Sequence, residues 1–220
     1  MSENIPEKGA AVQKDMKTYA ITPYIPGGLV DPASLHKIAD VAEKYNVKII
    51  KMNSEHRIGF YGIKEEDIEN IYADLGMGPG GFSGQCVRAA KFCIGNTSCK
   101  KAYQNTIELG LKIDEKFFKT PTPKKVKISL SGCPNSCGES AVRDIGLIGT
   151  PKGWKLLVGG TCGLQVKKGK TLARNLNDNE VVDMISKTLD YYKENGVEER
   201  MGRFIDKIGF DKFSQDVLGK

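Results

Sequence analysis

Two pairs of cysteines constrain the fold of this chain more than any other feature of its sequence. Cys93 and Cys99 lie in CIGNTSC, with C-x5-C spacing, and Cys133 and Cys137 lie in SGCPNSCGES, with C-x3-C spacing. Neither spacing is the C-x2-C of ordinary zinc knuckles or of thioredoxin-like redox sites. If the four thiols form one site, the fold must bring together two loops that a helix separates in the sequence.

Four thiolates in two pairs suit a soft metal, so the candidate occupants are a structural zinc ion and a 4Fe-4S cluster. Zinc usually takes tight C-x2-4-C knuckles, and the C-x5-C pair falls outside that range. A third interpretation treats the cysteines as buried, inert thiols. This fits poorly with the glycines and the proline that crowd both motifs. The spacing therefore favours an iron–sulfur cluster and leaves zinc and inert thiols as alternatives.

The composition is ordinary for a globular protein. The 220 residues suffice for one substantial domain or two small ones, with 40% hydrophobic and 27% charged residues. No apolar run approaches the ~18 residues that cross a bilayer. The first residues, MSENIPEKGAAVQKDMK, lack the apolar core of a secretory signal. We therefore expect a cytoplasmic protein that has no membrane partner and keeps its six cysteines reduced.

The first third of the chain predicts a ferredoxin-like half-domain over residues 17–76, after a flexible tail at residues 1–16. The pattern is strand, helix, strand, strand, helix, with the strands in VKIIKM and RIGFYGI. The first helix opens at Asp31-Pro32, an N-cap followed by proline at the first helical position. The second helix stops at Gly76. The apolar face predicted for the first helix comprises Leu35, Ile38, Ala42 and Tyr45.

Residues 77–220 predict a second domain of α/β type, so the fold class is α+β. The glycine-rich GMGPGGFSG, residues 76–84, predicts the linker between the domains. A helix is expected from about Lys100 to Phe117, followed by strands in KVKISL, DIGLIG and WKLLVGG. Short helices are expected through GRFIDKIGF. They follow a long helix whose predicted apolar face comprises Val181, Val182, Ile185, Leu189 and Tyr192.

The net charge of +6 favours an anionic ligand. Basic residues are scattered, without a Lys/Arg block, so nucleic acid is not the expected partner. In KKVKISL, strand alternation would place Lys125, Lys127 and Ser129 on one face and the apolar residues on the other. Two ammonium groups would then point at one target, although a solvated lysine face is the commoner explanation of such a pattern.

Taken together, C-x-G-x3-C and S-G-C-P-N-x-C resemble the motifs of the sulfite and nitrite reductase hemoproteins. ITPYIPGGLVDPASLHKIADVAEKY is similar to the ferredoxin-like half-domain of that family, and DIGLIG, the VGG turn and ERMGRFIDKIG are similar to its C-terminal part. The resemblance covers nearly the whole chain after the first ~16 residues. The length matches the small, single-unit members of the family. It implies a ferredoxin-like half-domain followed by a siroheme- and 4Fe-4S-binding domain.

The resemblance assigns the 4Fe-4S cluster to all four motif cysteines. Cys137 would also be the axial ligand of the siroheme iron and would bridge the two cofactors. The same resemblance assigns Asn135, Arg88 and Gly160 to cofactor binding. Cys86 is expected to be a buried or incidental thiol, and the sequence assigns no role to Cys162.

The implied reaction is reduction of sulfite to sulfide, with nitrite to ammonia as the close alternative. Arg57, Arg88, Lys125 and Lys127 would neutralise the anion, and the lysines would relay protons. Lys125 and Lys127 match a K-x-K pattern that the resembled family has ahead of the third motif cysteine, here Cys133. The resemblance therefore favours a functional lysine pair over a solvated lysine face.

Six electrons imply an external donor such as a ferredoxin, since the sequence has no NAD(P) or flavin fingerprint. A one-unit chain could also form a homo-oligomer that shares site residues. The competing hypothesis is a non-catalytic four-cysteine zinc or iron–sulfur module that binds a partner or nucleic acid.

Overall fold

The computed structural model describes residues 3–82 and 84–219. The chain forms two compact units, Met1–Gly84 and Gln85–Lys220, and each is considered by itself. The predicted linker belongs to the first unit up to Phe82. There, the Gly80 N–H donates to the carbonyl oxygen of Thr22 at 2.8 Å. In the described residues, no helix is long and apolar enough to cross a membrane.

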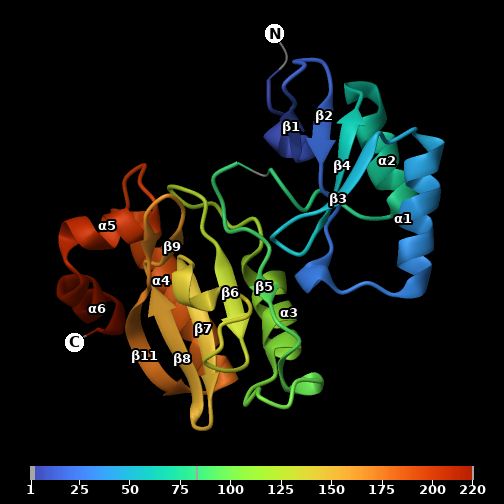
Figure 1. Ribbon diagram of the computed structural model, residues 1–220. Coiled ribbons are helices and arrows are strands. Elements are labelled where there is room, and N and C mark those ends of the chain that lie inside the picture. The colour runs from blue at the N-terminus through green and yellow to red at the C-terminus, as the bar shows by residue number, and fades with distance from the viewer. Residues whose placement is uncertain (1–2, 83, 220) are drawn as a thin grey trace. The chain divides into compact units, whose positions relative to one another are not determined.

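The first unit is an antiparallel four-stranded sheet, in the order β1-β2-β4-β3, packed against two helices (Figure 1). From β2 onward its order is the predicted strand, helix, strand, strand, helix. Its 3₁₀ turns are Pro6–Lys8, Pro26–Gly28 and Glu65–Asp67. Its strands and α-helices are β1 (Ala10–Val12), β2 (Tyr19–Ile21), α1 (Pro32–Lys44), β3 (Ile49–Met52), β4 (Ile58–Ile63) and α2 (Ile68–Leu75).

The prediction of a flexible tail at residues 1–16 was wrong for the segment that begins at Pro6. A 3₁₀ turn over Pro6–Lys8 leads into β1, which pairs with β2 in the register Ala10↔Ile21 to Val12↔Tyr19. Ala10 is fully buried. The polar residues around this short strand hid the pairing, because three residues show too little alternation to be recognised without the partner strand.

The start of α1 follows the predicted local chemistry. The Asp31 carboxylate accepts the Ser34 N–H at 2.7 Å, and proline occupies the first helical position. Ile38 and Ala42 are buried as predicted, whereas the prediction for Leu35 was wrong because 44% of its surface is exposed. The buried stripe therefore starts one turn later than the sequence pattern indicated.

The second unit is built on a mixed five-stranded sheet in the order β11-β8-β7-β6-β5 (Figure 1). β5, β6 and β7 are parallel, and β8 and β11 extend the sheet in antiparallel fashion. Its 3₁₀ turns are Gly95–Thr97 and Ser140–Val142. Its elements are β5 (Lys91–Phe92), α3 (Thr106–Phe117), β6 (Ile128–Ser131), β7 (Ile145–Thr150), β8 (Gly153–Val158), β9 (Thr161–Cys162), β10 (Val166–Lys167), β11 (Lys170–Leu176), α4 (Asp178–Asn195), α5 (Met201–Ile208) and α6 (Phe210–Leu218).

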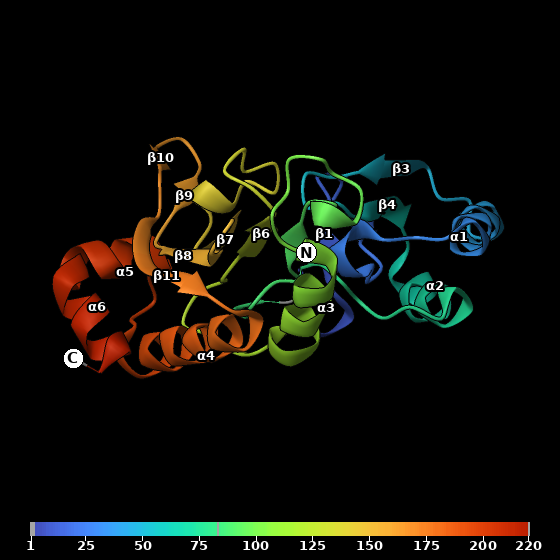
Figure 2. The same cartoon turned by 90° about the horizontal axis from the view of Figure 1, so that it is seen from below.

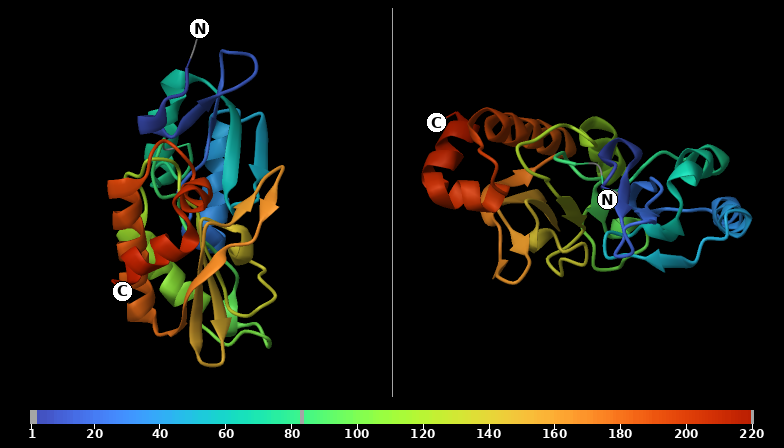
Figure 3. Two further views of the ribbon diagram at one scale, coloured as in Figure 1. Left: turned by 90° about the vertical axis from the view of Figure 1, so that its left-hand side faces the viewer. Right: turned by 90° about the horizontal axis from the view of Figure 1, so that it is seen from above.

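Helices α3 and α4 lie side by side on one face of this sheet (Figures 2 and 3). Lys112 of α3 donates to the side-chain oxygen of Asn179 in α4 at 2.8 Å. The apolar face predicted for the long helix is confirmed, since all five of its residues are buried in the core of this unit. Burial of each such aliphatic side chain contributes about 1.5–3 kcal/mol.

Two element boundaries in this unit differ from the prediction, and one long strand was missed. The helix expected from Lys100 begins at Thr106, because the Asn105 side chain caps it by accepting the N–H groups of residues 107 and 108. The strand expected from Lys125 begins at Ile128. β11 was not predicted, because Leu172 is its buried apolar residue between polar neighbours.

Candidate functional site

The two cysteine loops follow neighbouring parallel strands. Cys93 comes directly after β5, and Cys133 comes two residues after Ser131, the last residue of β6. The strands pair in the register Phe92↔Leu130. The carboxyl ends of parallel strands meet at one edge of a sheet, which is where α/β folds usually place their ligands. The fold therefore brings both cysteine motifs to the same edge.

Backbone contacts tie the two loops together. The Gly132 N–H donates to the Cys93 sulfur at 3.3 Å, and the Gly132 carbonyl accepts the Tyr103 N–H at 2.8 Å. A Cβ on Gly132 would lie 2.8 Å from the Ala102 Cβ and 3.1 Å from the Gly95 Cα. Glycine at position 132 therefore allows the C-x5-C loop and the C-x3-C loop to pack against each other.

Three buried serine hydroxyls hold the second cysteine loop against the sheet. The Ser131 hydroxyl accepts the Gly138 N–H at 3.0 Å and lies 2.8 Å from the Ser140 hydroxyl. The Ser129 hydroxyl donates to the Gly138 carbonyl. The Ser129 side chain is fully buried beneath the loop, and its placement on the same face as the two lysines stays a prediction.

All six cysteines are free thiols. Cys133 is buried, Cys93 and Cys99 are partly exposed, and Cys137 is exposed. Within residues 3–82 and 84–219, no three His, Cys, Asp or Glu side chains converge closely enough to hold a metal ion. The chemistry of these side chains still suits an iron–sulfur cluster, because four thiols lie on two hydrogen-bonded loops and the Cys93 sulfur accepts a backbone N–H.

The close fit of the loop on β7 leads to a stability prediction. A Cβ on Gly146 would lie 1.8 Å from the Ser140 carbonyl oxygen, which is backbone and cannot rotate away. We expect Gly146→Ala to lower the free energy of unfolding by about 1–3 kcal/mol and to lower the iron content. Urea unfolding and iron analysis measure both. In the control Gly163→Ala, the added Cβ meets nothing within 4 Å, so equal midpoints for the two variants would contradict the prediction.

A group of cations lies near the two predicted lysines. Burial lowers the pKa of Lys125, and the charges of Arg200, Lys127 and Arg88 lower it further. Each of these three cations is therefore close enough to Lys125 to lower its pKa, and the Asp144 carboxylate opposes the effect. The structure brings three of the predicted anion-binding residues together in this unit, and such a group attracts a small oxyanion.

Sequence reasoning missed Arg200. Its guanidinium lies at the N-terminus of α5 and donates to the Asp144 carboxylate at 2.6 Å and 3.3 Å. Asp144 is 1% exposed and also accepts the backbone N–H of Lys127 at 2.9 Å. In the ERMGRF segment an arginine stands beside a predicted helix start, which marks Arg200 as a candidate. The sequence did not show that the Arg200 side chain reaches Asp144.

Arg57 lies in the first unit. It is buried, and its guanidinium donates to the Gly80 carbonyl oxygen at 2.9 Å. This hydrogen bond joins the residue just before β4 to the segment that follows α2. The part of Arg57 in binding an anion stays a prediction.

The remaining predicted residues occupy different surroundings. Asn135 is exposed on the C-x3-C loop. Gly160 is buried, and a Cβ there would lie 2.6 Å from the Arg143 carbonyl oxygen. Their cofactor contacts stay predictions. The Cys86 thiol is buried, as expected, and burial raises its pKa. Cys162 is exposed in β9.

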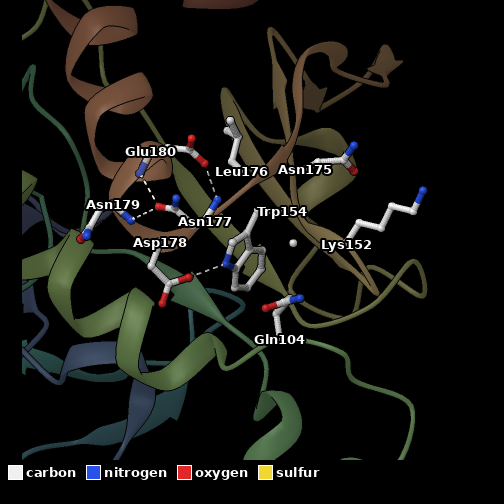
Figure 4. Close-up of a pocket in the computed structure, with 10 residues that line it drawn as sticks. Gln104, Lys152, Trp154, Asn175, Leu176, Asn177, Asp178, Asn179 and Glu180 are labelled. Carbon is white, nitrogen blue, oxygen red and sulfur yellow. Dashed lines mark hydrogen bonds between the residues drawn. The ribbon is translucent and has the colours of Figure 1, made fainter.

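Two cavities of this unit lie near these elements. One, of about 570 Å³, is bordered by Asp144, Gly160 and Arg200, with the β9–β10 hairpin and α5 completing its wall. The other, of about 530 Å³, lies at the start of α4, where the Trp154 indole N–H donates to Asp178 at 2.7 Å (Figure 4). Its polar groups serve the helix cap. The first cavity is therefore the one that adjoins the cation group.

Two hydrogen-bonded cysteine loops lie at the edge of a mixed sheet, and a cation group lies in the same unit. These features define the class as an iron–sulfur protein suited to small anions. Residues 83–220 match the family model of the nitrite and sulphite reductase 4Fe-4S domain, and residues 11–78 match that of the nitrite/sulfite reductase ferredoxin-like half domain. The chain therefore belongs to the nitrite and sulfite reductase family of siroheme- and 4Fe-4S-dependent oxidoreductases. The predicted resemblance and fold class are confirmed.

Relatives of two lengths match the chain. An assimilatory-type sulfite reductase of Nitratidesulfovibrio vulgaris is 39% identical over 96% of this chain and 98% of its own length. A nitrite reductase [NAD(P)H] of Bacillus subtilis is 36% identical over 95% of this chain, which spans only 26% of that protein. The crystal structure of dissimilatory sulfite reductase I superposes with a TM-score of 0.82 at 18% identity, covering 92% of this chain and 69% of the other, and supports the fold.

Proposed function

We propose that this chain catalyses the six-electron reduction of sulfite to sulfide. The observation that carries the proposal is the pair of bonded cysteine loops at the carboxyl edge of β5 and β6. The cations Arg88, Lys125, Lys127 and Arg200 lie in the same unit. The assimilatory-type sulfite reductase that aligns with nearly the whole chain supports sulfite as the substrate.

In this proposal Cys93, Cys99, Cys133 and Cys137 hold the 4Fe-4S cluster, and Cys137 also ligates the siroheme iron. When bound, these cofactors supply single electrons. Asn135, Gly160 and Arg88 contact the siroheme.

The protein's own part is to bind the anion and to deliver protons. Each sulfite takes up six electrons and six protons, and its three oxygens leave as water. The lysines Lys125 and Lys127 offset the negative charge of the bound anion together with Arg88 and Arg200. Arg57 is assigned to the same task. An ammonium group near the anion can donate a proton as each S–O bond breaks. Lys125 is well suited to this, because its lowered pKa makes it a stronger acid than an ordinary lysine.

We infer that electrons come from a separate donor protein such as a small ferredoxin, since the sequence has no nucleotide-binding fingerprint. The six free thiols support a reducing compartment, the cytoplasm. A homo-oligomer could share site residues between chains. Mixing a Lys127→Ala chain with a Cys137→Ala chain tests this, because recovered activity requires one site built from two chains.

The test of the reaction is the purified chain itself. We expect the Soret and red absorption bands of siroheme, iron and acid-labile sulfide, and a higher kcat/KM with sulfite than with nitrite when a reduced dye donates electrons. A colourless zinc protein would instead support the non-catalytic module. A kcat/KM at least about tenfold higher with nitrite would make the chain a nitrite reductase, the alternative that relatives such as the Bacillus subtilis enzyme favour.

A further inference from the structure

A buried lysine in β5 has no part in the function proposed so far. The Lys91 side chain is only 5% exposed, although β5 is at the edge of the sheet. Burying an ammonium group costs free energy unless an opposite charge compensates it. Lys91 lies two residues before Cys93, on the strand that leads into the first cysteine loop.

The compensating charge comes from the other cysteine loop. The Lys91 ammonium nitrogen lies 3.2 Å from a carboxylate oxygen of Glu139, two residues after Cys137. The guanidinium of Arg143, four residues further along, contacts the same oxygen. The Arg143 side chain is 7% exposed. One carboxylate therefore joins a cation on the first cysteine strand to a cation at the base of the second cysteine loop.

The backbone conformation at Glu139 also indicates a fixed position. Glu139 has φ +63°, in the left-handed region that non-glycine residues seldom adopt, and Ser136 in the same loop has φ +55°. The Glu139 N–H donates to the Ser136 carbonyl at 2.7 Å. Such conformations persist where surrounding contacts hold them. The turn that contains the exposed Cys137 thiol is therefore held from beneath while its sulfur faces outward.

The register of the sheet explains why Lys91 reaches the loop. Lys91 pairs with Ser129 of β6, so both side chains lie on the face that the second cysteine loop covers. The next residue, Phe92, lies on the opposite face, where Gly110 of α3 leaves room for its ring. The positive charge of Lys91 at this position helps to balance the Glu139 carboxylate.

We propose that Lys91, Glu139 and Arg143 form a clamp that positions Cys137 relative to the Cys93 strand. Its positioning role toward the cluster rests on the proposed function, whereas its role in anchoring the loop does not. The alternative is an ion cluster that stabilises the unit without any particular effect at the cysteines.

Two substitutions of the clamp separate these cases. Lys91→Met removes a positive charge beside the cysteines and keeps an apolar chain, and Glu139→Gln removes a negative charge with little change of shape. Charge near an iron–sulfur cluster changes its reduction potential. We expect Lys91→Met to lower the cluster potential and Glu139→Gln to raise it, relative to wild type. We also expect both to lose iron to a ferrous chelator about tenfold faster or more, as loss of outer-shell partners does.

The matched control is Lys212→Met, which breaks an exposed Lys212–Asp216 pair in α6 and removes the same charge far along the chain from the cysteines. It should leave the potential and the rate of iron loss unchanged. If both clamp variants shift the potential in one direction, or lose iron at the wild-type rate, the clamp does not position the cluster.

Hydrogen exchange of the metal-free chain tests the anchoring without any cofactor. The clamp predicts faster exchange at residues 133–142 in both variants, with the rest of the unit unchanged. Faster exchange throughout the unit, or no increase in exchange at residues 133–142, would overturn the anchoring role of the clamp. Glu139→Gln removes the carboxylate that both cations contact, whereas the double variant Lys91→Met/Glu139→Gln removes the Lys91 charge along with it. The double variant should therefore cost less than the sum of the single changes, and it serves if a single variant does not fold. A wild-type chain that carries no cluster would refute the proposed function and leave this exchange test valid.

Discussion

Replacing Cys137 by serine is expected to abolish most of the sulfite reduction while leaving the fold intact. Cys137 is exposed, and substitutions at exposed positions usually change the free energy of unfolding by no more than about 0.5 kcal/mol. As the proposed ligand shared by both cofactors, it should nevertheless be indispensable. Loss of a partner outside the ligand sphere already costs 10–100-fold, so we expect kcat/KM to fall more than about 100-fold. The siroheme absorption bands should fall with it.

Cys162→Ser is the matched control. Cys162 is also a free, exposed thiol of the second unit, and it belongs to neither cysteine motif. Activity, iron content and absorption should match wild type in this variant. If Cys137→Ser retains its iron, its siroheme bands and its rate, Cys137 is not the shared ligand. If Cys162→Ser loses them as well, the effect belongs to exposed thiols in general.

Local sequence signals predicted much of this fold. The Asp31-Pro32 start of α1, the apolar face of α4 and the order of helices and strands from β2 to α2 depend on residues close together in the chain, and they appear where expected. The second cysteine loop could also be placed, because a strand followed by Gly132 and Cys133 already indicates a tight loop after a strand. The family assignment followed from the same motifs.

Contacts between distant residues could not be predicted in the same way. Lys91 reads as an ordinary strand lysine until its register opposite Ser129 places it beneath the second cysteine loop. Arg200 becomes part of the cation group only through Asp144, which lies 56 positions away. The three residues of β1 are a strand because β2 is beside them. In each case the missing information was a pairing in space, which neither periodicity nor local propensity contains.

The second large effect is expected from Lys125→Ala/Lys127→Ala. Both residues are in the cation group, and the proposed function gives them the task of neutralising the anion and donating protons. Removing one preorganised donor from such a site typically costs 10²–10³-fold in rate. We therefore expect the double variant to lose at least about 100-fold in kcat/KM for sulfite. The iron content should stay at the wild-type value, since neither lysine is a cluster ligand in the proposal.

The control Lys116→Ala/Lys119→Ala removes the same two charges from exposed positions in the last turn of α3 and just after it, and wild-type kinetics are expected there. The pH profile adds an independent criterion. Lys125 has a lowered pKa, so its ammonium form, and with it kcat/KM, should be lost at a lower pH than for an ordinary lysine. The charge of Lys127 contributes to that lowering, so Lys127→Gln should move the alkaline limb to higher pH. A limb that stays in place would mean that Lys125 is not the group that titrates, and the proton donor would have to be sought elsewhere in the site.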